Sequence, residues 1–192
     1  MTSTEASRAQ RSGSRSPETK PDRVKVWDLA VRFFHWSLVI TFLIAWVTAD
    51  EWDRAHEISG YFIGGLVAFR ILWGLVGSKY ARFSNFVCKP ATVLQYLQDS
   101  LSFRAKRYIG HNPAGGAMVI ALLLSLIGVT VTGIAMVDPM FLDAEWMEEL
   151  HEIAANLTLV LVFIHVAGVI FTSFEHGENL VKAMVDGFKR RT

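Results

Sequence analysis

Two histidines in the last apolar stretch of the chain are the residues best suited to bind a cofactor. His151 and His165 lie fourteen positions apart in a run with few charged side chains. On an α-helix this spacing corresponds to about 21 Å of rise and leaves the two imidazoles within roughly 40° of one helix face. An ionisable side chain inside a bilayer is costly, so a histidine there indicates a functional site. One helix therefore offers two ligands at two depths.

The elements that must position these histidines are predicted to be membrane-spanning helices. Hydrophobic residues make up 52% of the 192 residues and the mean hydropathy is +0.31, which is too apolar for an ordinary soluble domain. Asn112 and Pro113 suit the start of a helix, and Asp143 is a suitable cap for the last one. We predict an all-α fold, a transmembrane four-helix bundle with helices at about 26–48, 55–76, 113–137 and 144–174.

The remaining segments flank or connect these helices. Residues 1–25 are rich in Ser and Arg and lack an apolar block, so we predict a disordered cytoplasmic tail ahead of one membrane domain, 26–192. Pro90 to Leu101 carries its apolar residues on one side, which is typical of a helix lying in the membrane interface; a soluble connecting helix is an equal alternative. The single cysteine, Cys88, excludes an internal disulfide and the usual covalent attachment of c-type haem.

The distribution of basic residues predicts the orientation. Lys and Arg are concentrated in the tail, the central connection and the C-terminus, whereas the other two turns contain only Arg54. Both termini should therefore be cytoplasmic. The opposite side of the membrane gathers acidic residues, namely Asp50, Glu51, Asp53, Asp138, Asp143, Glu145, Glu148 and Glu149.

With this orientation the histidines form two pairs by depth. His35, in the first helix, matches His165 toward the cytoplasm, and His56, at the start of the second, matches His151 toward the exterior. An imidazole pair fills both axial positions of a haem iron, and helix bundles build such sites from inward side chains. The pattern predicts two haems b, stacked across the membrane, with these four histidines as the iron ligands.

Two further residues are candidates for the haem propionates, and two alternatives are open. Arg70 and His111 should lie near the cytoplasmic side, where they could neutralise propionates, whereas His176 is interpreted as a boundary residue. A histidine inside a membrane can also be a structural residue, hydrogen-bonded to a neighbour. A histidine-lined metal transporter is the other alternative, but it should add intramembrane Asp or Glu, which the apolar cores of these helices lack.

The chain also resembles a known family, the prokaryotic cytochrome b561 family, which includes the cytochrome b subunits of nickel–iron hydrogenases. That resemblance implies four transmembrane helices in the bacterial inner membrane and two haems b bound by histidines at the positions of His35, His56, His151 and His165. It extends over about 24–191, and its most specific parts are R-F-F-H-W at 32–36, H-E-x-x-G-Y at 56–61, R-x-x-W-G at 70–74, G-H-N-P-x-G at 110–115 and the His151 and His165 pair.

The resemblance implies electron transfer across the membrane between a quinone pool and a periplasmic redox partner, such as a c-type cytochrome. Two alternatives from the same resemblance are a quinone-linked superoxide oxidase and a membrane anchor subunit of a dehydrogenase or hydrogenase. Whether the chain is itself an enzyme is therefore open. Besides quinone and the redox partner, membrane lipid is an expected partner and nucleic acid is not.

Overall fold

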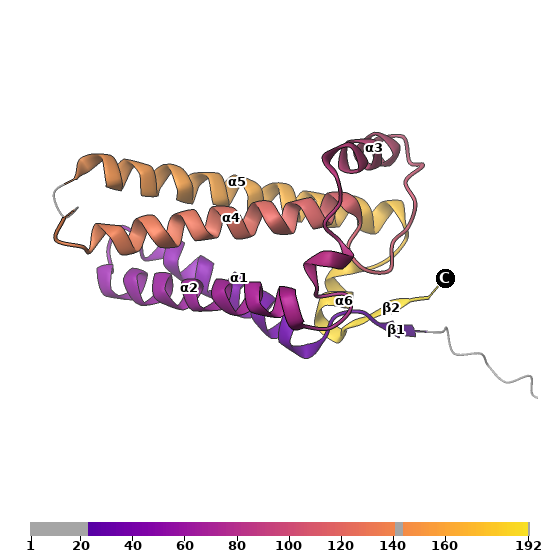
Figure 1. The fold of residues 1–192 in the computed structure, drawn as a ribbon, viewed down its shortest axis with the longest axis horizontal. Coiled ribbons are helices and arrows are strands. Elements are labelled where there is room, and N and C mark those ends of the chain that lie inside the picture. Colours follow the sequence, from indigo (N-terminus) through magenta and orange to yellow (C-terminus); the bar gives the residue numbers. More distant parts are fainter. Residues whose placement is uncertain (1–22, 141–143, 192) are drawn as a thin grey trace, which may run out of the picture.

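The protein is built around four long helices that run side by side (Figure 1). The computed structural model describes residues 23–140 and 144–191, so the predicted tail up to residue 22 and the predicted cap Asp143 lie outside the described residues. The long helices are α1 (Leu29–Val47), α2 (Asp53–Val76), α4 (Pro113–Met136) and α5 (Glu145–Glu175). Each is long and apolar enough to cross a membrane. Their bounds agree closely with the predicted ranges.

Local sequence explains where two of these helices begin. The Asp28 side chain accepts a hydrogen bond from the Val31 backbone N–H (2.8 Å) at the start of α1. Asn112 does the same for the Gly115 N–H (2.6 Å) at the start of α4, and Pro113 occupies the first turn. Both side chains satisfy backbone donors that have no partner within the helix. The predicted start of α4 at Asn112 and Pro113 is confirmed.

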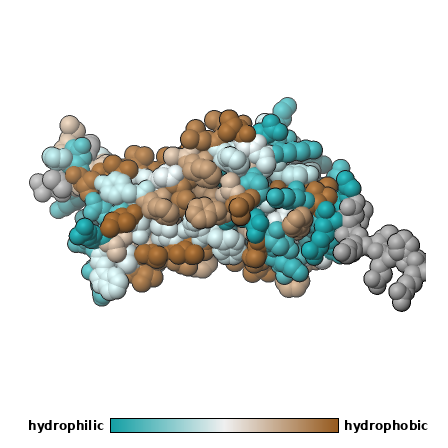
Figure 2. Space-filling view, turned by 90° about the horizontal axis from the view of Figure 1, so that it is seen from below, coloured by the Kyte–Doolittle hydropathy of each residue, from teal (hydrophilic) through white to brown (hydrophobic). Residues whose placement is uncertain are grey.

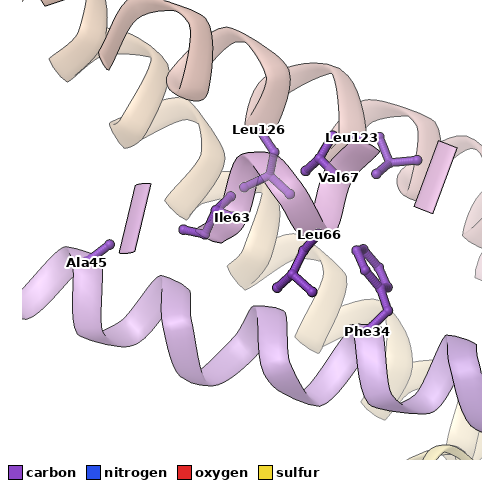
Figure 3. Packing of buried hydrophobic residues seen from close by; sticks show 7 residues of the cluster. All are labelled: Phe34, Ala45, Ile63, Leu66, Val67, Leu123 and Leu126. Carbon is purple, nitrogen blue, oxygen red and sulfur yellow. The ribbon is translucent and has the colours of Figure 1, made fainter. Parts of the chain in front are cut away.

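The buried core lies between three of the four long helices. It consists of apolar side chains from α1, α2 and α4, which Figure 3 shows pointing toward one another: Phe34, Ala45, Ile63, Leu66, Val67, Leu123 and Leu126. In contrast, α5 buries only Met147 and Thr158. The helices pack in the order α1 on α2, α2 on α4 and α4 on α5, and α1 has no comparable packing contact with α5. The side of the bundle between α1 and α5 is thus loosely packed.

The outer surface of the bundle suits a bilayer. Many large apolar side chains of the long helices are exposed, among them Ile40, Leu124 and Phe163. Figure 2 shows apolar surface over the middle of the molecule and hydrophilic surface gathered at the two ends. A helix of 24 residues, such as α2 or α4, is about 36 Å long, enough to cross a hydrocarbon core of about 30 Å.

One end of the bundle carries all the shorter elements. Here lie the 3-10 helix η2 (Phe83–Asn85), α3 (Pro90–Leu101), α6 (Leu180–Asp186) and a two-stranded sheet, in which β1 (Arg23–Lys25) pairs antiparallel with β2 (Phe188–Arg190). The helix predicted between Pro90 and Leu101 is confirmed as α3. The fold is mostly helical, as predicted, and this small sheet is an addition to it. Residues 23–25, which the sequence placed in the tail, form a strand because β2 supplies hydrogen-bond partners from the other end of the described chain.

Gly187 makes the turn from α6 into β2 possible. Its φ of +86° lies in the left-handed region, which only glycine adopts without cost, and a Cβ there would come within 2.7 Å of the Trp27 carbonyl oxygen. The Gly187 carbonyl in turn accepts hydrogen bonds from the backbone N–H groups of Val26 (2.9 Å) and Trp27 (3.1 Å). The turn therefore fixes the segment that leads into α1.

Candidate functional site

The structure brings His35 and His165 together. His35 lies on α1 and His165 on α5, and their ring centres are 6.4 Å apart with an angle of 57° between the ring planes. The Nδ1 atom of His35 is buried and has no hydrogen-bond partner within the described part of the chain. The two imidazoles meet across the side of the bundle where α1 and α5 do not pack on each other.

The second predicted pair is also brought together. His56, in the first turn of α2, and His151 of α5 have ring centres 6.0 Å apart, with ring planes 82° apart. His56 Nδ1 lies 2.8 Å from the carbonyl oxygen of Ala45. A carbonyl can only accept a hydrogen bond, so Nδ1 is the donor and Nε2 keeps its lone pair.

His151 is oriented by a threonine of α4. Its Nδ1 lies 3.0 Å from Thr132 Oγ1, and the Thr132 hydroxyl donates to the carbonyl oxygen of Gly128 (2.8 Å). Since that hydroxyl proton is engaged, Thr132 Oγ1 can accept from His151 Nδ1–H, which leaves the Nε2 lone pair available for a metal. Gly133 adds room: a Cβ at this position would lie 3.1 Å from the His151 ring. Thus α4 carries no histidine but positions one, a role that its sequence did not indicate.

Both pairs fit two axial ligands of one metal. A metal–imidazole bond of about 2 Å on each side, added to the radii of two five-membered rings, spans roughly 6 Å between ring centres. The observed separations are 6.4 and 6.0 Å. All four histidines are partly exposed rather than enclosed in the core. Within residues 23–140 and 144–191, no three His, Cys, Asp or Glu side chains gather into a metal site made by protein ligands alone.

Glycines leave open space beside both pairs. Gly60 lies one turn after His56 on the same face of α2, and Gly168 lies one turn after His165 on α5. A Cβ added at either position would meet nothing within 4 Å. A flat macrocycle bound between the imidazoles needs such space along both helices.

Arg70 and His111 lie together near the first pair. Arg70 is 3% exposed; its Nη2 donates to the Ala81 carbonyl oxygen (3.1 Å), while its Nη1 is buried with no partner among the described residues. His111 lies between the rings of Trp27 and Phe86, with centres 4.7 and 4.5 Å away. Burial, followed by the positive charge of Arg70, lowers the pKa of His111 to about 3. In these surroundings His111 is neutral and Arg70 carries the charge.

Asp28 holds the first turn of α1 against the end of α2. Its carboxylate accepts hydrogen bonds from Trp73 Nε1 (3.1 Å) and from the Ser78 hydroxyl. Burial alone would raise the pKa of Asp28, but the hydrogen bonds from Ser78, the Val31 backbone and Trp73 outweigh it and hold the pKa below its ordinary value. The charged carboxylate therefore fixes the helix that carries His35.

A second polar cluster was not predicted from the sequence. Glu175, at the end of α5, has a side chain that is 3% exposed; its Oε2 accepts from the Ser100 hydroxyl of α3 (2.7 Å) and lies 3.8 Å from His176 Nε2. Burial and then the charge of Glu175 raise the pKa of Tyr96 to about 12. These residues are far apart in the sequence, and no spacing pattern links them. They attach α3 to α5, and His176 lies here rather than in either histidine pair.

Comparison with known proteins settles the family. The family model described as prokaryotic cytochrome b561 matches residues 26–187. The chain belongs to the prokaryotic cytochrome b561 family. It is therefore a b-type cytochrome whose cofactor is haem b, a component of electron transport and a multi-pass protein of the bacterial inner membrane.

Curated relatives of this cytochrome b561 are similar over most of their length. A protein of Cupriavidus necator, described as a probable Ni/Fe-hydrogenase B-type cytochrome subunit, is 24% identical over 85% of this chain and 86% of its own. Proteins of Azotobacter vinelandii and Azotobacter chroococcum with the same description are each 24% identical over 88% of this chain and 90% of their own. No solved structure has significant similarity to the chain.

Proposed function

We propose that this cytochrome b561 transfers electrons across the membrane through two haems b, one bound by His35 and His165 and the other by His56 and His151. The observation that carries the proposal is the pairing of four imidazoles at 6.4 and 6.0 Å from three separate helices. Two unrelated structural histidines would have no reason to face each other at this separation, and here the arrangement occurs twice.

The surrounding residues support the same interpretation. When bound, haem would supply an iron centre that accepts and releases one electron, and with both histidines of a pair holding the iron no position would remain open for substrate. Ala45 and Thr132 engage Nδ1 of His56 and His151, which leaves Nε2 of each ring available to bind iron. Arg70 would supply positive charge, and His111 a ring N–H, to the propionates of the haem at the His35 pair.

With two haem sites, electrons would cross the membrane in successive steps. His151 and His165 are both on α5, about 21 Å apart along the helix, so the sites lie at different depths. We place the His35 pair toward the cytoplasm, and both chain termini there, because the end of the bundle with α3, α6 and the sheet holds most Lys and Arg residues. Reporter fusions after Arg191 and within 138–149 test this; an exported C-terminus would contradict it.

A reduced-minus-oxidised optical spectrum, with a haem-to-protein ratio, tests the central proposal. We expect low-spin b-type bands and two haems per chain. A ratio of about one haem per chain would mean that only one of the two proposed sites binds haem. Turnover with quinone and superoxide alone tests the second activity, quinone-linked superoxide oxidation, which needs no protein partner.

The redox partner is proposed to bind at the acidic end. The exposed residues Asp50, Glu51, Asp53, Glu145, Glu148 and Glu149 all lie at the turns opposite the basic end. Complementary charge would raise the rate of encounter with a basic periplasmic protein, such as a c-type cytochrome, and quinone would be the other reactant. The rate of electron exchange with a basic cytochrome should then fall as ionic strength rises, and a rate insensitive to salt would contradict this partner.

A hydrogenase is the second candidate partner. It is favoured by the three relatives, each described as a probable Ni/Fe-hydrogenase B-type cytochrome subunit. In that role the chain would anchor the hydrogenase and take electrons from it. Affinity purification of the full chain from mild detergent, followed by a hydrogen-dependent haem reduction assay, tests it. Reduction by hydrogen requires a bound hydrogenase, whereas a chain that copurifies with none favours the periplasmic cytochrome as the partner.

A further inference from the structure

Helix α3 has an apolar face that no other part of the described chain covers. Leu94, Leu97 and Leu101 are 59%, 44% and 77% exposed, and their spacing places them on one side of the helix. Tyr96 and Ser100 lie on another side and are buried against the bundle. The leucine face therefore points away from the protein.

This face lies beside the lipid-facing surface of the bundle. Figure 1 shows α3 outside the bundle, next to the ends of α4 and α5, and α3 packs on α4. The ring of Phe103, just after α3, is 5.6 Å from the ring of Phe171 on α5. Since Phe171 belongs to a membrane-spanning helix, α3 lies at the depth where the apolar surface of α5 ends.

Basic side chains border the same face. Lys89 precedes the first turn of α3, and Arg104 and Lys106 follow its last turn; all three are exposed. Their side chains form no ion pair or hydrogen bond with any part of the chain that the structure describes. The one acid of α3, Asp99, lies on the side away from the leucines.

We propose that α3 is a binding surface for anionic phospholipids: its leucines enter the acyl region of the leaflet, and Lys89, Arg104 and Lys106 bind the lipid headgroups. An amphipathic helix with an apolar face and basic residues at its borders binds in the membrane interface, more strongly where lipids are anionic. Each basic residue near the surface can enrich anionic lipid locally by up to about fivefold. This surface is independent of the proposed haem ligands and of the redox partner.

The natural Cys88 allows a direct test. It is exposed, lies next to Lys89, and is the single cysteine of the sequence, so it can carry one fluorophore without other changes. The labelled full-length holoprotein is reconstituted into two sets of nanodiscs with the same mixture of phosphatidylglycerol and phosphatidylcholine. In one set the phosphatidylglycerol chains are brominated, and in the other the phosphatidylcholine chains are, so the ratio of quenching reports which lipid surrounds α3.

Brominated phosphatidylglycerol should quench the wild-type label about two- to fivefold more, per lipid present, than brominated phosphatidylcholine. The combined variant Lys89→Gln, Arg104→Gln and Lys106→Gln should bring this ratio to one. A matched variant, Arg23→Gln with Lys25→Gln and Lys182→Gln, removes the same charge from the same end of the bundle and should keep the wild-type ratio. The haem spectrum of each variant, compared with that of the wild type, reports whether the bundle is intact.

Three results would overturn the proposal. Equal quenching by the two lipids in the wild type would mean that α3 does not select anionic headgroups. Quenching by neither lipid would mean that solvent or another protein covers the leucine face. Equal loss of the preference in both charge variants would assign it to the overall charge of this end rather than to α3.

Discussion

The two histidine pairs differ in what holds their imidazoles. His56 and His151 each have a hydrogen-bond partner at Nδ1, from Ala45 and Thr132, whereas the Nδ1 of His35 has none within the described residues. A hydrogen bond at the second nitrogen fixes the tautomer and raises the basicity of the nitrogen that binds the metal. If both pairs bind haem, the haem at His56 and His151 has the more electron-rich ligands, so the two sites should differ in reduction potential.

Single replacements by alanine should divide the histidines into two classes. His35→Ala and His165→Ala would remove a proposed ligand from one site, and His56→Ala and His151→Ala would remove one from the other. Each variant should lose or alter one haem and largely keep the second. Redox titration followed by optical spectroscopy measures this, and the members of a pair should give matching spectra and potentials.

His176→Ala serves as the control and should retain both haems, because His176 belongs to neither imidazole pair. Four ligand variants that all retained two low-spin haems would show that these histidines are not the ligands. A grouping of His35 with His151 would show that the pairing across α1 and α5 is incorrect.

Thr132→Val should change the potential of one haem. Valine keeps the shape of threonine but cannot accept the hydrogen from His151 Nδ1, so the imidazole becomes a weaker donor and the oxidised iron is less stabilised. We expect a higher midpoint potential at the His56 and His151 site, and haem affinity there reduced about tenfold or more. Thr132→Ser should restore the wild-type potential.

Thr158→Val is the matched control for this change. Thr158 is also buried and also donates to a helix carbonyl, that of Ala154 (2.8 Å), but this hydrogen bond involves no histidine. Replacing Thr158 by valine should leave the reduction potentials of both haems unchanged. Equal shifts in the Thr132 and Thr158 variants would mean that the effect arises from general repacking.

Among the helices, α5 supplies a ligand to each proposed site, α1 and α2 supply one ligand each, and α4 supports α2 and α5. The close approach of α2 to α4 depends on Gly64, where a Cβ would come within 2.8 Å of Thr130 Cγ2. The sequence has three glycines in this part of α2, Gly60, Gly64 and Gly65, but it does not distinguish their roles. In the structure Gly64 faces α4, whereas Gly60 and Gly65 face open space.

Gly64→Leu should therefore disrupt the bundle, and Gly65→Leu should not. A leucine at 64 must push α2 away from α4, which costs about 1–3 kcal/mol or more for an overpacked contact. Haem content and thermal stability in detergent should fall in this variant. The neighbouring Gly65→Leu introduces the same side chain into open space and should retain both properties; a similar loss in both would mean that leucine is harmful anywhere on α2.

At the scale of the whole molecule, the sequence predicted the parts that depend on composition and helical spacing. The four spans, α3 and the pairing of histidines by depth all follow from local patterns in apolar and polar residues. The pairing of β1 with β2, the ribbon formed by the two-stranded sheet, could not be predicted in this way. Each strand has only three residues, and the two strands come from opposite ends of the described chain, as in the pairing of Arg23 with Arg190, so no local pattern could match them.

The hydrogen-bond partners of the histidines could not be predicted from the sequence either. Ala45 and Thr132 are ordinary residues of apolar helices, and their contacts with His56 and His151 depend on how the helices pack. Sequence spacing determines which face a residue occupies but not which atom of a neighbouring helix it meets. For this reason the histidines could be predicted as ligands, whereas the residues that orient them required the structure.

The ribbon joins the two ends of the described chain, and its stability should depend on pH through Glu178. This buried carboxylate accepts hydrogen bonds from Arg107 Nη2 (2.9 Å) and the Arg190 backbone N–H (3.2 Å), and it lies 3.6 Å from Lys189 Nζ. Burial alone would raise the pKa of Glu178, but the hydrogen bond from Arg107 and the charge of Lys189 outweigh it, so the pKa lies below its ordinary value of 4.5. The contribution of Glu178 to stability is thus fully present above pH 4.5 and is lost as the pH falls through the folded-state pKa.

Glu178→Gln should loosen the ribbon at neutral pH and remove this acid-dependent loss. Glutamine can still accept at its carbonyl oxygen but lacks the negative charge, which makes a hydrogen bond about 1 kcal/mol stronger, so the amides of Val26 and Trp27, which donate to Gly187, should exchange roughly fivefold faster. Hydrogen exchange of the 23–27 segment, corrected for intrinsic rates at about pH 6 and about pH 4, measures both effects. Glu148→Gln, which changes an exposed carboxylate at the opposite end, should keep the wild-type response to acid. If the wild-type ribbon exchanged equally at both pH values, Glu178 would not be the charge that holds the two ends together.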